Sequence, residues 1–117
     1  MKQQDIYFPQ LHDTFVYTIG QNAQDNFDII DAADPDDYWF HVHDAPSAHV
    51  IVRIPTDYNK KEKGYIIKKG CELAKQHSSS KSSKKVVCVF CKVRHLAKTS
   101  VPGKVELHES VSHYITL

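Results

Sequence analysis

Asp-Asp-Tyr-Trp-Phe-His-Val-His-Asp-Ala-Pro-Ser-Ala-His-Val-Ile-Val-Arg-Ile, residues 36–54, is the segment around which this 117-residue chain is organised. Two runs of alternating side chains flank a turn at residues 44–47. Alternate positions place three side chains on one face of each run: Trp39, His41 and His43 on the first, and His49, Ile51 and Arg53 on the second. A period of two predicts two short strands joined by a turn.

The length of that turn decides whether the two polar faces coincide. Pairing His43 with Ala48 across a four-residue loop would put His41 and His49 on opposite faces of the sheet. A three- or five-residue loop, or a bulge, would bring them to the same face. The sequence leaves both registers open.

The segments on either side of the hairpin predict an α+β fold. Residues 1–13 have no periodicity and are expected to be a loose lead-in, followed by a single domain over residues 14–117. The expected elements are strands at 14–19, 86–95, 104–108 and 113–117, a short helix at 26–33 capped by Asp25, a main helix at 60–77 and a loop at 96–103. Together they predict a mostly antiparallel sheet of about five or six strands with one main and one short helix.

Charge is divided unevenly along the chain. Residues 1–57 hold ten acidic and two basic side chains, whereas residues 58–117 hold four acidic and thirteen basic ones. Such a division can steer a polyanion such as RNA onto the basic part. The alternative is that the two halves attract each other within the fold.

Several classes of protein are disfavoured by composition. No apolar run is long enough for a membrane span, and the N-terminus has no secretory signal, so a cytoplasmic location is expected. The Cys88-x-x-Cys91 pair is not expected to bind a metal, because side chains three apart on a strand point to opposite faces. The sequence has no dinucleotide or P-loop motif, and no cofactor is expected.

Short motifs around the hairpin resemble a known family. They are Ile19-Gly20-Gln21-Asn22 with Asn26, Asp37-Tyr-Trp-Phe-His-Val, Ser47-Ala-His-Val-Ile-Val-Arg53, Leu96-Ala-Lys98-Thr99 and Val101-Pro102-Gly103. In this order they resemble the NFACT-R domain, the RNA-binding module of the NFACT proteins of ribosome-associated quality control. The similarity covers roughly residues 14 to 110, and the small eukaryotic proteins that carry the domain alone look closer. Gln21 and Ser47 stand where the family has a basic residue and a glycine.

The resemblance implies an RNA partner, tRNA or ribosomal RNA, with the ribosome or a protein as a further partner. For such a role Trp39 or a histidine would stack on an exposed base, Asn22 or Asn26 would contact a base edge, and Arg53 would hold a phosphate. Further candidates for phosphate contact lie in the basic segment that resembles the family's Lys-rich strand end: Lys92, Arg94 and Lys98.

Two other functions remain open from the residues alone. Two histidines and a cation could process or modify RNA, with His41 and His49 as acid and base and Arg53 on the phosphate. This enzyme hypothesis requires the three- or five-residue loop, or the bulge, that brings His41 and His49 to the same face. An adaptor whose acidic half binds a basic protein is the third hypothesis. A structural role also competes, in which Trp39 is part of the core and Arg53 pairs with Asp36 or Asp37.

Overall fold

The computed structural model describes all residues from 1 to 117 and has an α+β architecture, as predicted. Six strands form one antiparallel sheet in the order β1-β2-β4-β3-β5-β8. Their bounds are β1 Lys2–Phe8, β2 Asp13–Ile19, β3 Tyr38–Val42, β4 Val50–Val52, β5 Val87–Lys92 and β8 His113–Thr116. A separate two-stranded sheet contains β6 Leu96–Lys98 and β7 Val105–Leu107.

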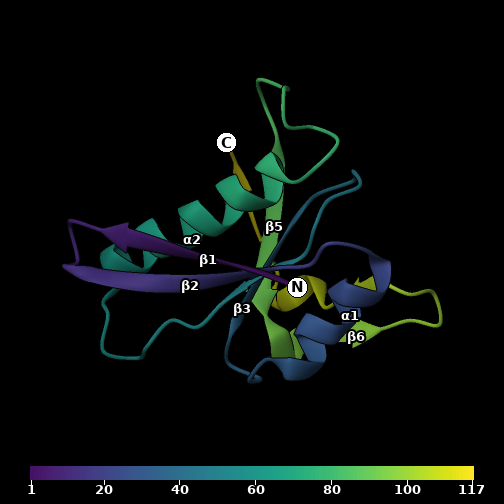
Figure 1. Cartoon of the computed structure of the whole chain (residues 1–117), viewed down its shortest axis with the longest axis horizontal. Helices are drawn as coiled ribbons and strands as arrows, with labels where there is room; N and C mark the ends of the chain where they lie inside the picture. Colours follow the sequence, from purple (N-terminus) through teal and green to yellow (C-terminus); the bar gives the residue numbers. More distant parts are fainter.

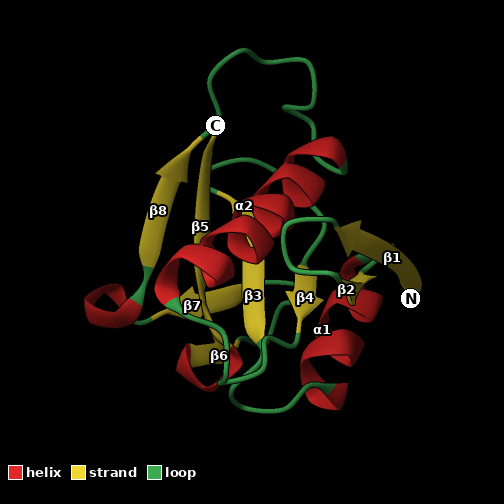
Figure 2. Ribbon diagram, turned by 90° about the vertical axis from the view of Figure 1, so that its left-hand side faces the viewer, coloured by secondary structure: helices red, strands yellow, loops and turns green.

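Two α-helices cover opposite faces of the large sheet. The main helix α2, Lys60–Gln76, lies across β3 on one face (Figure 2), and α1, Ala23–Ala32, lies with β6 on the other side (Figure 1). Two 3-10 turns, Val93–His95 and Glu109–Val111, follow β5 and precede β8. No helix is both long enough and apolar enough to cross a membrane.

The larger core lies between α2 and the sheet. Phe40, Val50 and Leu73 are among its fourteen buried residues. The helix comes close to β3 at Gly70, where an added Cβ would lie 2.5 Å from the ring of Phe40. The hydroxyl of Tyr17 also donates a hydrogen bond of 2.7 Å to the carbonyl of Ile66. The helix is therefore held to both β2 and β3, and this face of the sheet is closed.

A smaller core of seven buried residues lies on the opposite face, where α1 and the β6–β7 hairpin cover the sheet. Ile29 packs there with Trp39 and Cys91, whereas Cys88 lies in the α2 core. The expectation that Cys88 and Cys91 point to opposite faces is therefore confirmed. Because this second cover is only partial, His41 on β3 remains half-buried on this face of the sheet.

Three details of the predicted elements are wrong. Residues 2–8 are not a loose lead-in, because β1 pairs with β2 over its whole length, from Lys2 opposite Ile19 to Phe8 opposite Asp13. The short helix begins at Ala23, since the side chain of Asn22 accepts a hydrogen bond from the Asp25 backbone and acts as the N-cap. The expected loop at 96–103 begins with β6, which pairs with β7.

Candidate functional site

The register of the central hairpin places the histidines together. Trp39 pairs with Ile51 and Phe40 with Val50, so His41 faces His49 on the neighbouring strand. The two imidazole rings are 5.1 Å apart and nearly perpendicular. This register is the one expected for a three- or five-residue loop, and it brings His41 and His49 to the same side of the sheet.

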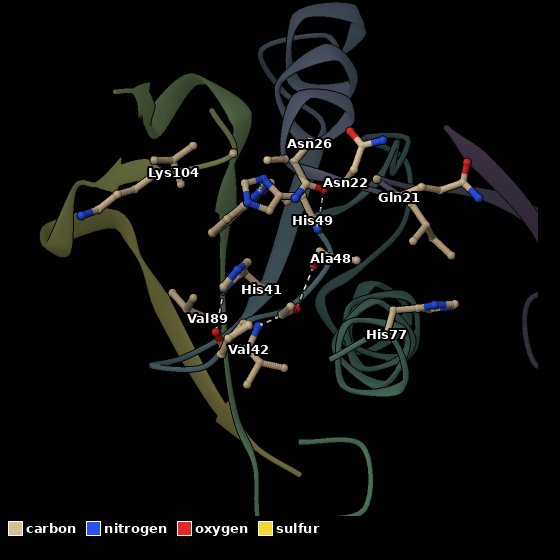
Figure 3. Close-up of a pocket in the computed structure, with 18 of the residues that line it drawn as sticks. Gln21, Asn22, Asn26, His41, Val42, Ala48, His49, His77, Val89 and Lys104 are labelled. Carbon is tan, nitrogen blue, oxygen red and sulfur yellow. Dashed lines mark hydrogen bonds between the residues drawn. The ribbon is translucent and has the colours of Figure 1, made fainter. Parts of the chain in front are cut away.

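A cleft of about 880 Å³ opens over these residues (Figure 3). The sheet forms its floor through Trp39, His41 and His49. Its walls come from the loop and helix start at residues 19–23, from His77 at the end of α2 and from the β6–β7 hairpin around Gly103. The volume falls in the range of roughly 300–1,000 Å³ that is typical of small-ligand sites.

Backbone hydrogen bonds hold the walls in place. Ala48 donates to the carbonyl of His77 at 3.0 Å, which ties the hairpin turn to the end of α2. On the other side Gly20 donates to the carbonyl of His49 at 3.0 Å, and His49 donates to Oδ1 of Asn26 at 3.1 Å. These bonds fix the start of α1 against β4. The expected strands and helices thus converge on one cleft.

His49 is a neutral, buried histidine. It is 1% exposed, and its Nδ1 accepts a hydrogen bond of 3.0 Å from the indole Nε1 of Trp39. Because an indole N–H only donates, the hydrogen of the imidazole must sit on Nε2. Burial lowers the pKa of His49 to about 3, with the charge of His41 adding to the effect and a hydrogen bond with the Gly103 backbone opposing it.

His41 lies nearer to the open side of the cleft and is half-buried. Its ring stacks on Trp39 with 5.7 Å between centroids and 9° between planes. Its Nδ1 lies in hydrogen-bond contact with the carbonyl of Val42, so the neutral ring carries hydrogen on Nδ1 and a free lone pair on Nε2. Burial lowers the pKa of His41, the bond to Val42 partly opposes this, and His43 adds to it.

The structure does not support the proposed stacking role of Trp39. The indole is 1% exposed, its Nε1 is bonded to His49, and His41 covers it on the side of the cleft. Stacking on a nucleobase needs an exposed ring face. Trp39 is therefore the support of the two histidines, and His41 is the ring that a ligand can reach.

Asn22 and Asn26 line the cleft, but each already uses its side-chain oxygen. Oδ1 of Asn22 caps α1, and Oδ1 of Asn26 accepts from the backbone of His49. Only their amide nitrogens remain as donors toward a ligand. Gln21, the residue between Gly20 and Asn22, is exposed at the edge of the same cleft.

Arg53 lies outside the cleft. Register places it opposite Asp37, four residues or about 13 Å along β4 from His49. Its guanidinium contacts Asp34 at 2.7 Å and Asp37 at 3.0 Å, so it holds the turn before β3, as the structural alternative proposed. His41, His49 and Arg53 do not form one catalytic constellation, because the cation is distant and the lone pair of His49 is occupied.

The basic segment after β5 also lies outside the cleft. Lys92 and Arg94 pair with Asp36, and Lys98 pairs with Asp31 while its ammonium lies 5.5 Å from the ring centre of Phe27. These ion pairs are exposed and contribute little to stability. They nevertheless compensate the charges that the sequence suggested for phosphate contact. Attraction between the two halves of the chain thus accounts for three of its fifteen basic side chains.

The cleft itself keeps uncompensated positive charge. Lys2 and Lys104 are the only lysines or arginines that line it, and neither forms an ion pair. Its one carboxylate, Asp44, lies 3.1 Å from His43. Sequence reasoning missed both lysines and His77. Lys2 was assigned to the lead-in, and only the position of Lys104 directly after Pro102-Gly103 could have indicated it.

The fold and the cleft define a small α+β binding module with amide, imidazole and ammonium groups around one opening. The model of the NFACT protein RNA binding domain family matches residues 5–109, and the chain belongs to this family. A relative in Dictyostelium discoideum, the coiled-coil domain-containing protein 25 homolog, is 32% identical over 74 residues. This match covers 62% of the chain and 36% of the relative, so the chain corresponds to only part of that protein.

A solved structure shows the same fold. The C-terminal part of the fibronectin/fibrinogen-binding protein from Streptococcus suis matches with a TM-score of 0.80 and 22% sequence identity. The match covers 100% of this chain and 45% of the solved one. At this level of identity the likeness concerns the fold.

The buried state of His49 predicts a loss of stability in mild acid. Below pH 6.5, the ordinary pKa of histidine, His49 binds a proton in the unfolded chain but not in the folded chain. The free energy of unfolding therefore has its highest value above pH 6.5 and falls as the pH decreases toward 3. From pH 8 to pH 5 the expected loss from His49 is about 2 kcal/mol. Urea unfolding at both pH values measures it.

The control for this pH effect is His49→Asn, which cannot titrate and retains an acceptor for the Trp39 indole. The variant should lose about 2 kcal/mol less than the wild type between pH 8 and pH 5. An unchanged difference between the two pH values would place the titration elsewhere, on His41 or His77, whose pKa values burial also lowers.

Proposed function

We propose that this chain is a noncatalytic module that binds structured RNA, tRNA or ribosomal RNA, through the cleft. We place it in the cytoplasm, in translation or ribosome-associated quality control, with the ribosome or a protein as a further partner. Membership of an RNA-binding domain family supports RNA as the ligand. The charge of the cleft carries the proposal, because Lys2 and Lys104 form no ion pair, whereas the basic residues after β5, Lys92, Arg94 and Lys98, are paired with aspartates.

Charge elsewhere on the surface also favours a polyanion. The lysines of α2 and of the loop that follows it form no ion pairs, and they are Lys60, Lys61, Lys63, Lys68, Lys69, Lys75, Lys81, Lys84 and Lys85. Such charges speed the approach of RNA at low salt without selecting a sequence. An adaptor would offer the acidic residues of the first half to a basic partner, but four of those ten residues, Asp31, Asp34, Asp36 and Asp37, pair with lysine or arginine within the chain.

The test is the salt dependence of binding to tRNA. For Lys2→Ala/Lys104→Ala the slope of log K against log salt should become shallower by about 1.4 to 1.8, since each phosphate contact contributes roughly 0.7 to 0.9. Fluorescence anisotropy between 50 and 300 mM salt gives the slope. The RNA is recovered afterwards and checked for cleavage, and a matched duplex DNA tests the preference for RNA.

A matched control has the same change in net charge far from the cleft. Lys60→Ala/Lys61→Ala alters the first turn of α2, about 24 Å along the helix axis from His77. This pair should change the slope by less than half as much. Equal slopes for both double variants would contradict the placement of RNA in the cleft. Cleaved RNA would favour an enzyme, and no binding to RNA would favour the adaptor.

The cations paired with aspartates provide a separate prediction. Lys92→Ala/Arg94→Ala removes two charges that lie against Asp36. We expect the salt slope to change by less than 0.5, because a cation engaged by a carboxylate displaces few counterions from RNA. The same anisotropy titration measures it. A salt slope that becomes shallower by about 1.4 to 1.8, the value for two phosphate contacts, would show instead that these residues leave Asp36 and bind phosphates.

A further inference from the structure

We infer that the cleft receives one unpaired nucleotide of the RNA, with its base against His41 and its neighbouring phosphates toward Lys2 and Lys104. This inference rests on the proposed function and specifies the kind of RNA. It is carried by two features of the cleft: a supported aromatic ring on the floor, and lysines without ion pairs in the walls.

The ring of His41 is built as a stacking platform. The ring of Trp39 stacks on it with an angle of 9° between the two ring planes, and the ring of His49 contacts it edge-on with an angle of 88°. The side chain of His41 lines the cleft (Figure 3). With Trp39 and His49 almost fully buried behind it, the ring is held in one orientation. Stacking on a fixed ring costs little conformational entropy and tolerates any base.

The same ring also offers a hydrogen-bond acceptor. Because Nδ1 of His41 is bonded to the Val42 carbonyl, the lone pair of Nε2 stays free for an amino or imino N–H of a base. The amide nitrogens of Asn22 and Asn26 supply donors from the opposite wall. Donor and acceptor groups are the partners that the edges of an unpaired base require.

Positive charge lies on both sides of this floor. Lys104 projects from the β6–β7 side of the cleft, opposite the side of His77 (Figure 3). Lys2 pairs with Ile19 in the sheet, beside the Gly20 loop. Burial lowers the pKa of His77, and the nearby charge of Lys2 adds to this effect. A strand that crosses the cleft would therefore meet an ammonium group on either side of the inserted base.

Base pairing would prevent this fit. The faces of bases in a duplex are covered by their neighbours, and the major groove of an A-form helix is too narrow for side chains to read. A base reaches the floor at His41 only after it leaves the stack, which costs least where it has no pairing partner. Bulges, loops and ends of structured RNA are thus the expected targets.

The test compares two RNA hairpins that differ at one position. In one, a single 2-aminopurine is bulged, and in the other it is paired with uridine. We expect the bulged hairpin to bind at least 5-fold more tightly, with quenching of the 2-aminopurine fluorescence on binding. His41→Ala should weaken binding of the bulged hairpin about 5-fold to 10-fold and leave the paired hairpin unchanged, since loss of one stacking contact has effects of this order.

A second variant separates stacking from folding. His41→Phe retains an aromatic ring but loses the Nε2 acceptor, so it should recover most of the affinity lost in His41→Ala. Equal affinity of the wild type for both hairpins, or an equal loss for both in His41→Ala, would overturn the inference and leave the proposed function intact. Absence of binding to either hairpin and to tRNA would overturn both.

Discussion

Replacement of Trp39 by alanine should lower the free energy of unfolding by about 3 to 5 kcal/mol, the range for a large aromatic residue deleted from a core. The indole is 1% exposed and packs with Ile51 and Val89 between the sheet and its partial cover. Its removal also leaves Nδ1 of the buried His49 without a donor. Urea unfolding of the wild type and the variant, analysed with the same m-value for both, measures the loss.

Two further variants give this prediction its meaning. Tyr7→Ala removes an aromatic ring that is 58% exposed from β1 and should change stability by no more than about 0.5 kcal/mol. Trp39→Phe should remain folded and bind tRNA within about 2-fold of the wild type, because Trp39 supports His41 and does not contact the ligand. If Trp39→Ala were as stable as Tyr7→Ala, the indole would have to be exposed, and its role as a stacking residue would return.

Gly20→Ala is expected to damage both stability and RNA binding. An added Cβ would lie 1.9 Å from Oδ1 of Asn26, the atom that accepts a hydrogen bond from the backbone of His49. Asn26 must therefore move, and the buried N–H of His49 loses its acceptor. Overpacking and an unpaired buried donor each cost about 1 to 3 kcal/mol, so we expect a loss of about 2 to 6 kcal/mol.

The chain contains its own control for this substitution. Gly64 lies in α2, and a Cβ there would meet nothing within 4 Å. Gly64→Ala should stabilise the protein by about 0.5 to 1 kcal/mol, since alanine is the better helix former. Gly20→Ala should also cost less in an Asn26→Ala background than in the wild type. Equal costs in the two backgrounds would mean that contact with Asn26 is not the cause.

The site is the place where prediction from sequence was least complete. Resemblance and alternation both pointed to His41 and His49, and the structure brings these two residues together. Trp39 and Arg53 lie on the same strand faces, yet Trp39 is buried and Arg53 is held by Asp34 and Asp37. Alternation identifies the face of a strand, but it does not reveal how much of that face a neighbouring element covers.

The sequence also does not reveal which basic side chains are free to bind phosphate. The sequence places thirteen basic side chains after residue 57, and the strand end with Lys92 and Arg94 appeared to be the natural phosphate site. In the fold Asp36 lies beside both of them, whereas Lys2, from the acidic half, lines the cleft without a partner. Which cations remain free depends on carboxylates more than fifty residues away in the chain.

The α+β class, the main helix and most strands could be predicted from the sequence, because they follow from local periodicity and capping. The family could also be predicted from the sequence, because its motifs are short runs of neighbouring residues. The register of the central hairpin, the strand at residues 2–8 and the neutral state of His49 could not be predicted in this way and are evident from the three-dimensional structure. Each of these depends on contacts between segments distant in sequence, where a shift of one residue moves a side chain to the other face.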